Sequence, residues 1–201
     1  MPNPYTIIED CSPYYIRFTH DGLDKIIDIC KQGMEGLEFE NTFTHYKFPQ
    51  EIRKEILSTT PLSKSLNLQE NRASMFVTKG GRYYQAHKDG IDNRISLNYT
   101  VEILDDKCVT NWYSDDDLAE YNLEGLGWEV PSREAKRFDK TKHTPVKSMT
   151  AKSNECILFN TDIWHDFDNS QSTNRRMVLT LRVNYCNTFY FHDARKALFG
   201  F

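Results

Sequence analysis

The stretch that decides the fold is residues 84–90, YQAHKDG, in which His87 and Asp89 stand two positions apart. At the end of an extended strand, residues i and i+2 point to the same side, so this imidazole and this carboxylate converge. A second histidine, His165, ends the buried-type strand predicted at residues 159–165, FNTDIWH. Two imidazoles and one carboxylate are the ligand set that holds Fe(II) and leaves coordination positions open. The sequence therefore predicts a metal centre of His87, Asp89 and His165.

Two adjacent arginines follow the second histidine. Arg175 and Arg176 come roughly ten residues after it, where an apolar strand begins. A guanidinium binds a carboxylate through two parallel hydrogen bonds and keeps its charge, which suits a dicarboxylate that chelates a metal at its other end. Arg175 shares its strand face with apolar residues, so it is predicted to point into the barrel, with Arg176 and Arg182 outside. Arg176 remains the competing candidate, and a structural salt bridge is the alternative role for Arg175.

The apolar pattern elsewhere predicts helices first and strands afterwards. Residues 21–34 and 49–57 have helical spacing. Residues 79–82, KGGR, are predicted as a hairpin turn, with a mobile flap as the alternative. After residue 70 the period changes to two, which predicts strands at residues 73–78, 94–103, 108–113, 155–160 and 176–185. Asn98 and Tyr99 lie on opposite faces of the strand predicted at residues 94–103. Either could help to hold the far carboxylate of such a dicarboxylate or the substrate, although core packing or surface exposure is the more common role for each. Helices followed by short strands are typical of helices packed on a β-barrel or sandwich.

Composition excludes several classes of function. The chain has 201 residues, a net charge of −4 and 13% aromatic residues, so we expect a folded protein. Its net charge gives no indication of nucleic-acid binding, although it leaves room for a local basic patch. No apolar run approaches the roughly 20 residues that span a bilayer, and the first residues lack the pattern of a secretory signal. The five widely spaced cysteines are typical of reduced thiols, which predicts a cytoplasmic protein. Nucleophilic hydrolase and P-loop motifs are absent from the sequence.

The order H-x-D, a long gap, then His followed by Arg resembles the Fe(II)/2-oxoglutarate-dependent oxygenase superfamily. Residues 84–89 are similar to its prolyl-hydroxylase-like branch, and residues 165–175 are similar to the aspartyl/asparaginyl β-hydroxylase and phytanoyl-type branches. The resemblance implies a mainly β fold with flanking helices, the double-stranded β-helix or jelly roll of cupin-like proteins, with the metal at its mouth.

With that resemblance, the whole chain is predicted to be a single oxygenase domain. It divides into helical support at residues 1–70, a double-stranded β-helix core at 71–186 with an insertion at 105–150, and a C-terminal tail at 187–201.

The resemblance also implies an activity and its cosubstrates. Fe(II) would be bound by the three predicted ligands, 2-oxoglutarate would chelate it through the 1-carboxylate and 2-keto oxygen, and O2 would be the second cosubstrate. The implied reaction hydroxylates an unactivated C–H bond of a peptide side chain, an amino acid or another small molecule, and releases succinate and CO2. Related halogenases lack the carboxylate ligand, so Asp89 favours hydroxylation. Neither nucleic acid nor membrane is expected as a partner, and the oligomeric state is open.

Two other functions are compatible with the sequence. In a non-catalytic β-sandwich binding module, H-x-D would be a strand-end turn, His165 a structural histidine, and no iron would bind. A cupin-like metalloenzyme would use the metal without a 2-oxo acid. Cupins normally bring more histidines to the metal, and no H-x-H accompanies the H-x-D motif here.

Overall fold

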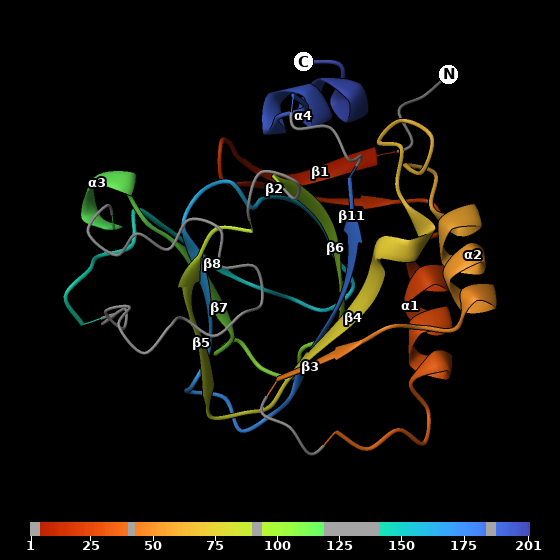
Figure 1. The fold of residues 1–201 in the computed structure, drawn as a ribbon, viewed down its shortest axis with the longest axis horizontal. Helices are drawn as coiled ribbons and strands as arrows, with labels where there is room; N and C mark the ends of the chain where they lie inside the picture. Colours follow the sequence, from red (N-terminus) through yellow and green to blue (C-terminus); the bar gives the residue numbers. More distant parts are fainter. Residues whose placement is uncertain (1–4, 40–42, 90–93, 119–140, 184–187) are drawn as a thin grey trace.

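The structure, a computed structural model, consists of two antiparallel sheets that face each other. It describes residues 5–39, 43–89, 94–118, 141–183 and 188–201. The larger sheet has the strand order β1 (Tyr5–Cys11), β2 (Tyr15–His20), β9 (Cys156–Asn160), β6 (Ile95–Glu102), β11 (Arg176–Arg182), β4 (Ala73–Thr78), β3 (Phe43–Tyr46). The smaller sheet has the order β5 (Arg82–His87), β10 (His165–Asn169), β7 (Val109–Trp112), β8 (Lys147–Thr150). This arrangement is a jelly roll, as predicted (Figure 1).

Helices cover the outer face of the larger sheet. α1 (Leu23–Gly33) and α2 (Gln50–Thr59) lie beside each other next to β4, β6 and β11 (Figure 1). In α1 the buried side chains recur at helical spacing, which confirms the helix predicted for residues 21–34. α2 begins directly after Pro49, because proline is favoured where a helix starts and its missing N–H costs nothing.

β11 shows how the larger sheet is packed on both faces. All seven of its residues are buried. Met177, Leu179 and Leu181 belong to the core shared with α1 and α2, whereas Arg176 and Arg182 line a cavity between the two sheets. The outer face is therefore the apolar one, and the inner face carries the polar residues.

The first 70 residues are more than helical support, which corrects the prediction. β1 and β2 form a hairpin that extends the larger sheet through β9, and β3 forms its other edge beside β4. Residues 105–150 are likewise not only an insertion, because β7 and β8 belong to the smaller sheet. Short edge strands are stabilised by partners far away in sequence, so their local pattern is weak.

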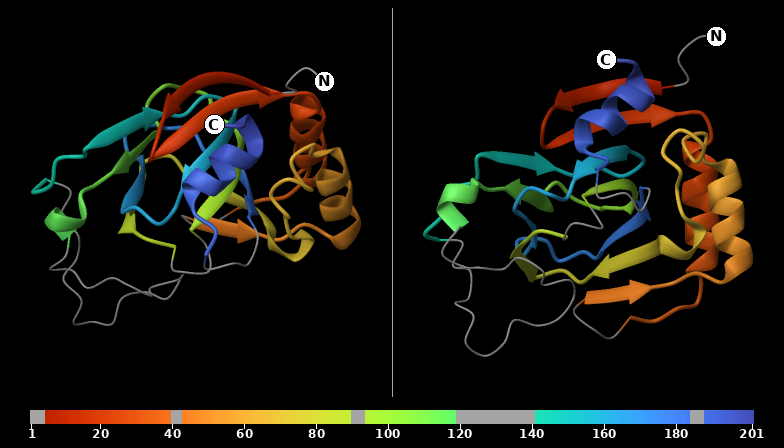
Figure 2. Two further views of the ribbon diagram at one scale, coloured as in Figure 1. Left: turned by 90° about the horizontal axis from the view of Figure 1, so that it is seen from above. Right: turned by 45° about the horizontal axis from the view of Figure 1, so that its top comes forward.

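The C-terminal tail contains a helix, α4 (Phe191–Phe199), that lies across the N-terminal hairpin (Figure 2). The ring of Phe199 packs edge-to-face against Phe18 at 5.2 Å and against Tyr5 at 6.0 Å. Two short helical turns complete the described elements: a 3-10 turn at Glu70–Arg72 and α3 at Asp115–Leu118. Among the helices in the described ranges, none has the length and apolar character needed to cross a membrane.

The segment predicted as a hairpin turn, residues 79–82, instead carries the chain from the larger sheet to the smaller one. Gly81 has a φ of +72°, and its N–H donates to the carbonyls of Asn169 at 3.0 Å and Ser172 at 2.7 Å. A Cβ on Gly80 would lie 2.4 Å from the carbonyl carbon of Thr173. The two glycines therefore permit a close crossing that no larger residue could make.

Candidate metal centre

The two predicted histidine ligands are direct neighbours on adjacent strands. His87 ends β5 and His165 begins β10, and the two residues are partners in the antiparallel register. Their ring centroids are 4.5 Å apart. Cross-strand pairs place side chains on the same face, so both imidazoles point into the space between the sheets. The strand predicted at residues 159–165 in fact ends at Asn160, and His165 starts the next one.

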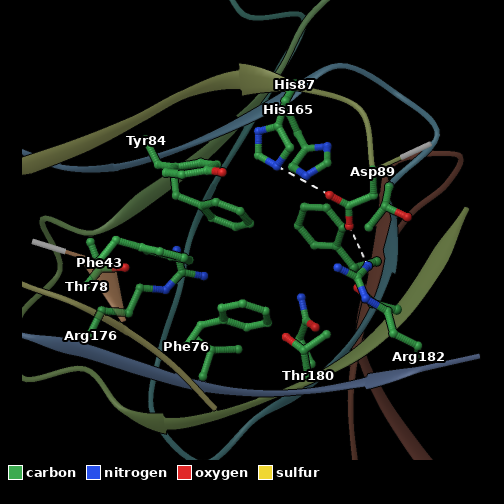
Figure 3. A pocket seen from close by; sticks show the side chains of 16 residues that line it. Phe43, Phe76, Thr78, Tyr84, His87, Asp89, His165, Arg176, Thr180 and Arg182 are labelled. Carbon is green, nitrogen blue, oxygen red and sulfur yellow. Dashed lines mark hydrogen bonds and ion pairs between the residues drawn. The ribbon is translucent and has the colours of Figure 1, made fainter. Parts of the chain in front are cut away.

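Asp89 completes the group from the loop after β5. Its backbone N–H donates to the carbonyl of Thr161 at 3.1 Å, which ties this loop to the turn before β10. Asp89 Oδ1 lies 3.3 Å from His87 Nε2 (Figure 3). One ligand atom from each of His87, Asp89 and His165 lies within 4.8 Å of the others. The structure therefore brings together all three predicted metal ligands.

The hydrogen bonds of the imidazoles suit a metal centre. His87 Nδ1 lies 2.9 Å from the carbonyl of Gln85, and His165 Nδ1 lies 2.8 Å from the carbonyl of Ile163. A carbonyl only accepts, so each Nδ1 carries the hydrogen and each neutral ring presents an Nε2 lone pair. Metal-bound histidines usually donate their other N–H in this way. Burial lowers the pKa of His165 to about 3, so its ring is neutral at neutral pH.

The carboxylate is charged although it is buried. Burial alone would raise the pKa of Asp89, but the adjacent guanidinium of Arg182 outweighs it and lowers the pKa well below its usual range. In the neutral state of His87, a lone pair of Nε2 and a carboxylate oxygen therefore face each other at 3.3 Å. A divalent cation between them would be bound by both. The residues present thus fit Fe(II), which prefers two imidazoles and a carboxylate.

The cavity beside these ligands is enclosed by both sheets. Its volume is about 540 Å³, including the open mouth. Phe43, Phe76, Tyr84 and Phe167 form an aromatic wall. The Phe43 ring stacks against Phe76 at 5.6 Å and against Tyr84 at 5.0 Å, so β3 closes the gap between the larger and the smaller sheet. Concave sites with apolar walls and a few polar groups are typical of small-molecule binding.

Arg176 points into this cavity (Figure 3). It is 6% exposed, and its Nε has no hydrogen-bond partner. The guanidinium carbon lies 4.6 Å from the centroid of Phe167, whose ring in turn lies 5.6 Å from that of His165. The cation is therefore one aromatic ring away from the triad. Within the described part of the chain, no carboxylate pairs with it.

The prediction that Arg175 points into the barrel is wrong. Its side chain is 49% exposed, and its Nε donates to Glu102 Oε1 at 2.6 Å on the outside of the sheet. This hydrogen bond raises the pKa of Arg175. The assignment failed because the apolar face of β11 packs on the helices, so the polar face is left for the cavity.

Asn98 and Tyr99, the two further candidates for binding the cosubstrate or the substrate, point to opposite faces of β6. Asn98 lines the cavity, and its Oδ1 is buried without a hydrogen-bond partner. Tyr99 points the other way, into the core beneath the helices, where its hydroxyl lies 3.0 Å from His20 Nε2. Asn98 therefore lies at the candidate site, and the prediction that Tyr99 could contribute to it is wrong.

Sequence reasoning missed two residues at the site, Arg182 and Phe167. Arg182 pairs with Asp89, although it was predicted to face outward. The sequence did contain an indication, because Arg182 shares one strand face with Arg176 and Thr180. Phe167 follows His165 by two positions and so shares its face.

Comparison with known proteins supports the fold. No protein-family model matches the sequence, and no curated protein matches it either. The structure resembles HygX from Streptomyces hygroscopicus with nickel and 2-oxoglutarate bound, with a TM-score of 0.55 at 7% identity over 84% of this chain and 81% of that one. HygX with nickel, 2-oxoglutarate and hygromycin B gives a TM-score of 0.56 at 8% identity, over 85% and 83% of the two chains. This chain therefore has the jelly-roll fold that HygX also has, with a His-Asp-His triad inside it.

Proposed function

We propose that the protein is an Fe(II)- and 2-oxoglutarate-dependent dioxygenase. The observation that carries this proposal is the triad of His87, Asp89 and His165 in a cavity that also holds the buried guanidinium of Arg176. The ligand set leaves coordination positions open for a chelating cosubstrate. The similarity to HygX adds support, because that protein was solved with a metal and 2-oxoglutarate.

In this proposal Arg176 binds the distal carboxylate of 2-oxoglutarate. A buried guanidinium without an anionic partner is costly, and a ligand carboxylate would supply that partner. The Phe167 ring lies between this cation and His165, so a molecule that chelates the metal extends along an apolar wall towards the guanidinium. The low polarity of this wall strengthens the ion pair.

The triad residues would hold the metal, beside the aromatic wall of the cavity. His87 and His165 would bind through Nε2 and Asp89 through Oδ1. With metal and cosubstrate bound, the chemistry supplied is oxidation: 2-oxoglutarate and O2 are consumed, succinate and CO2 are released, and a C–H bond of the substrate becomes C–OH. The rings of Tyr84 and Phe159, each 4.9 Å from one imidazole, hold the ligands in orientation.

We further propose a small molecule, an amino acid or a peptide side chain as the oxidised substrate. The structure of HygX with hygromycin B shows a small molecule bound to a protein of this fold, which favours the first class.

The test is the anaerobic visible spectrum of the protein with Fe(II), before and after 2-oxoglutarate is added. A 2-oxo acid chelated to Fe(II) gives a weak charge-transfer band, which is expected here and should be lost in His165→Ala. Iron binding without the band would support a cupin-like metalloenzyme that does not use 2-oxoglutarate. If no iron binds, the protein is a binding module and the proposal is refuted.

A further inference from the structure

A second arginine of β11 contacts the carboxylate of the triad. Arg182 Nη1 donates to Asp89 Oδ2, while Asp89 Oδ1 faces His87 Nε2 at 3.3 Å. Figure 3 shows Asp89 between the two groups, with one oxygen directed to each. The two oxygens of this carboxylate therefore have different partners.

The position of Arg182 is fixed by the larger sheet. It pairs with Ser96 in the register of β11 and β6, and β11 lies between two other strands. The side chains of Arg182 and Asp89 are each 11% exposed. Because Asp89 follows β5 of the smaller sheet, the ion pair links the two sheets directly beside the triad. A buried pair held in this way keeps its geometry better than a surface pair.

We propose that Arg182 is a positioning residue that makes Asp89 a one-oxygen ligand of the metal. This inference rests on the proposed metal centre. A carboxylate can bind a cation through one oxygen or through both. With Oδ2 held by Arg182, only Oδ1 is directed towards the histidines.

Whether Asp89 binds through one oxygen or two decides how many coordination positions remain for the cosubstrates. Two imidazoles and one carboxylate oxygen would fill three positions of a six-coordinate metal and leave three open. A chelating 2-oxo acid would take two of these and leave one for O2. If Oδ2 also bound the metal, no position would remain for O2 once the cosubstrate was in place. Arg182 would thus keep one position open for oxygen.

The experiment counts water molecules on Mn(II) bound to the full-length protein, by water-proton relaxation. We expect about three waters in the wild type and about one after saturation with 2-oxoglutarate. Arg182→Met should show about two and then none, so relaxation per bound Mn(II) falls by roughly one third before the cosubstrate is added. Arg182→Lys keeps a cation for Oδ2 and should restore the wild-type values. Arg175→Met is the matched control, because it removes an exposed arginine next to the same strand and should change nothing.

The wild type alone can overturn the inference, so a variant that fails to fold does not weaken the test. Two waters on wild-type Mn(II) would mean that Asp89 binds through both oxygens despite Arg182. Unchanged relaxation in a folded Arg182→Met protein would show that the ion pair serves only to link the sheets. If Mn(II) binds His165→Ala as well as the wild type, the proposed metal centre itself fails, and the inference fails with it.

Discussion

Arg176→Ala tests the proposed cosubstrate site most directly. The substitution removes a guanidinium that is 6% exposed and has no anionic partner among the described residues. If a ligand carboxylate binds there, truncating one partner of such a buried charge pair costs about 3–4 kcal/mol. At 1.4 kcal/mol for each factor of ten, the Kd for 2-oxoglutarate should rise by about 10²–10³-fold. The affinity for Fe(II) should not change, because no triad residue is hydrogen bonded to Arg176.

The assay is an anaerobic titration of the Fe(II) protein with 2-oxoglutarate, followed through the charge-transfer band. Arg175→Ala is the matched control, because Arg175 is exposed and paired with Glu102 outside the cavity. The reasoning would be refuted if Arg176→Ala weakened binding by less than about fivefold, which is ~1 kcal/mol. It would also be refuted if Arg175→Ala caused the same loss, since that residue cannot reach the cavity.

The same guanidinium should lower the stability of the ligand-free protein. An unpaired buried charge is unfavourable, so Arg176→Met should raise the free energy of unfolding by about 1–3 kcal/mol in the absence of metal and 2-oxoglutarate. Urea unfolding of the two proteins measures the difference. A decrease in stability would mean that Arg176 serves the fold rather than a ligand.

Three further predictions concern metal binding, pH and the crossing between the sheets. His165→Ala should abolish the rise in Tm that Fe(II) gives the wild type, because a ligand that binds only the folded state stabilises it; an undiminished rise would place the metal elsewhere. The pKa of His165 is lowered to about 3, so between pH 3 and 6.5 the unfolded chain binds a proton that the folded one does not. The stability of the metal-free protein should therefore fall as the pH drops from 6.5 to 4, and His165→Gln should flatten this slope in urea midpoints. Gly80→Ala should lower the free energy of unfolding by more than about 2 kcal/mol, since its Cβ would meet the backbone of Thr173 at 2.4 Å; a near-neutral result would show that the crossing can shift.

Two of the three candidate metal ligands could be predicted from sequence because their signal is local. His87 and Asp89 are two positions apart at a strand end, so their convergence needs no knowledge of the rest of the chain. The strands at residues 73–78 and 94–103 were also predictable, because their apolar residues alternate. The position of His165 beside His87 was only implied by the family pattern, and the register of β5 and β10 now shows it.

The sequence by itself therefore determined the ligand types, the strand-rich core and the two amphipathic helices, since these depend on spacing within a few residues. Only the tertiary structure decided which face of β11 lines the cavity. The two-residue period of a strand places Arg175 and Arg176 on opposite faces, but it does not show on which face the helices pack. The same holds for Asn98 and Tyr99, and for the N-terminal strands, whose partners lie far along the chain. The pairing of Arg182 with Asp89 joins two sheets, and no local pattern encodes a contact between residues brought together only by the closure of the barrel.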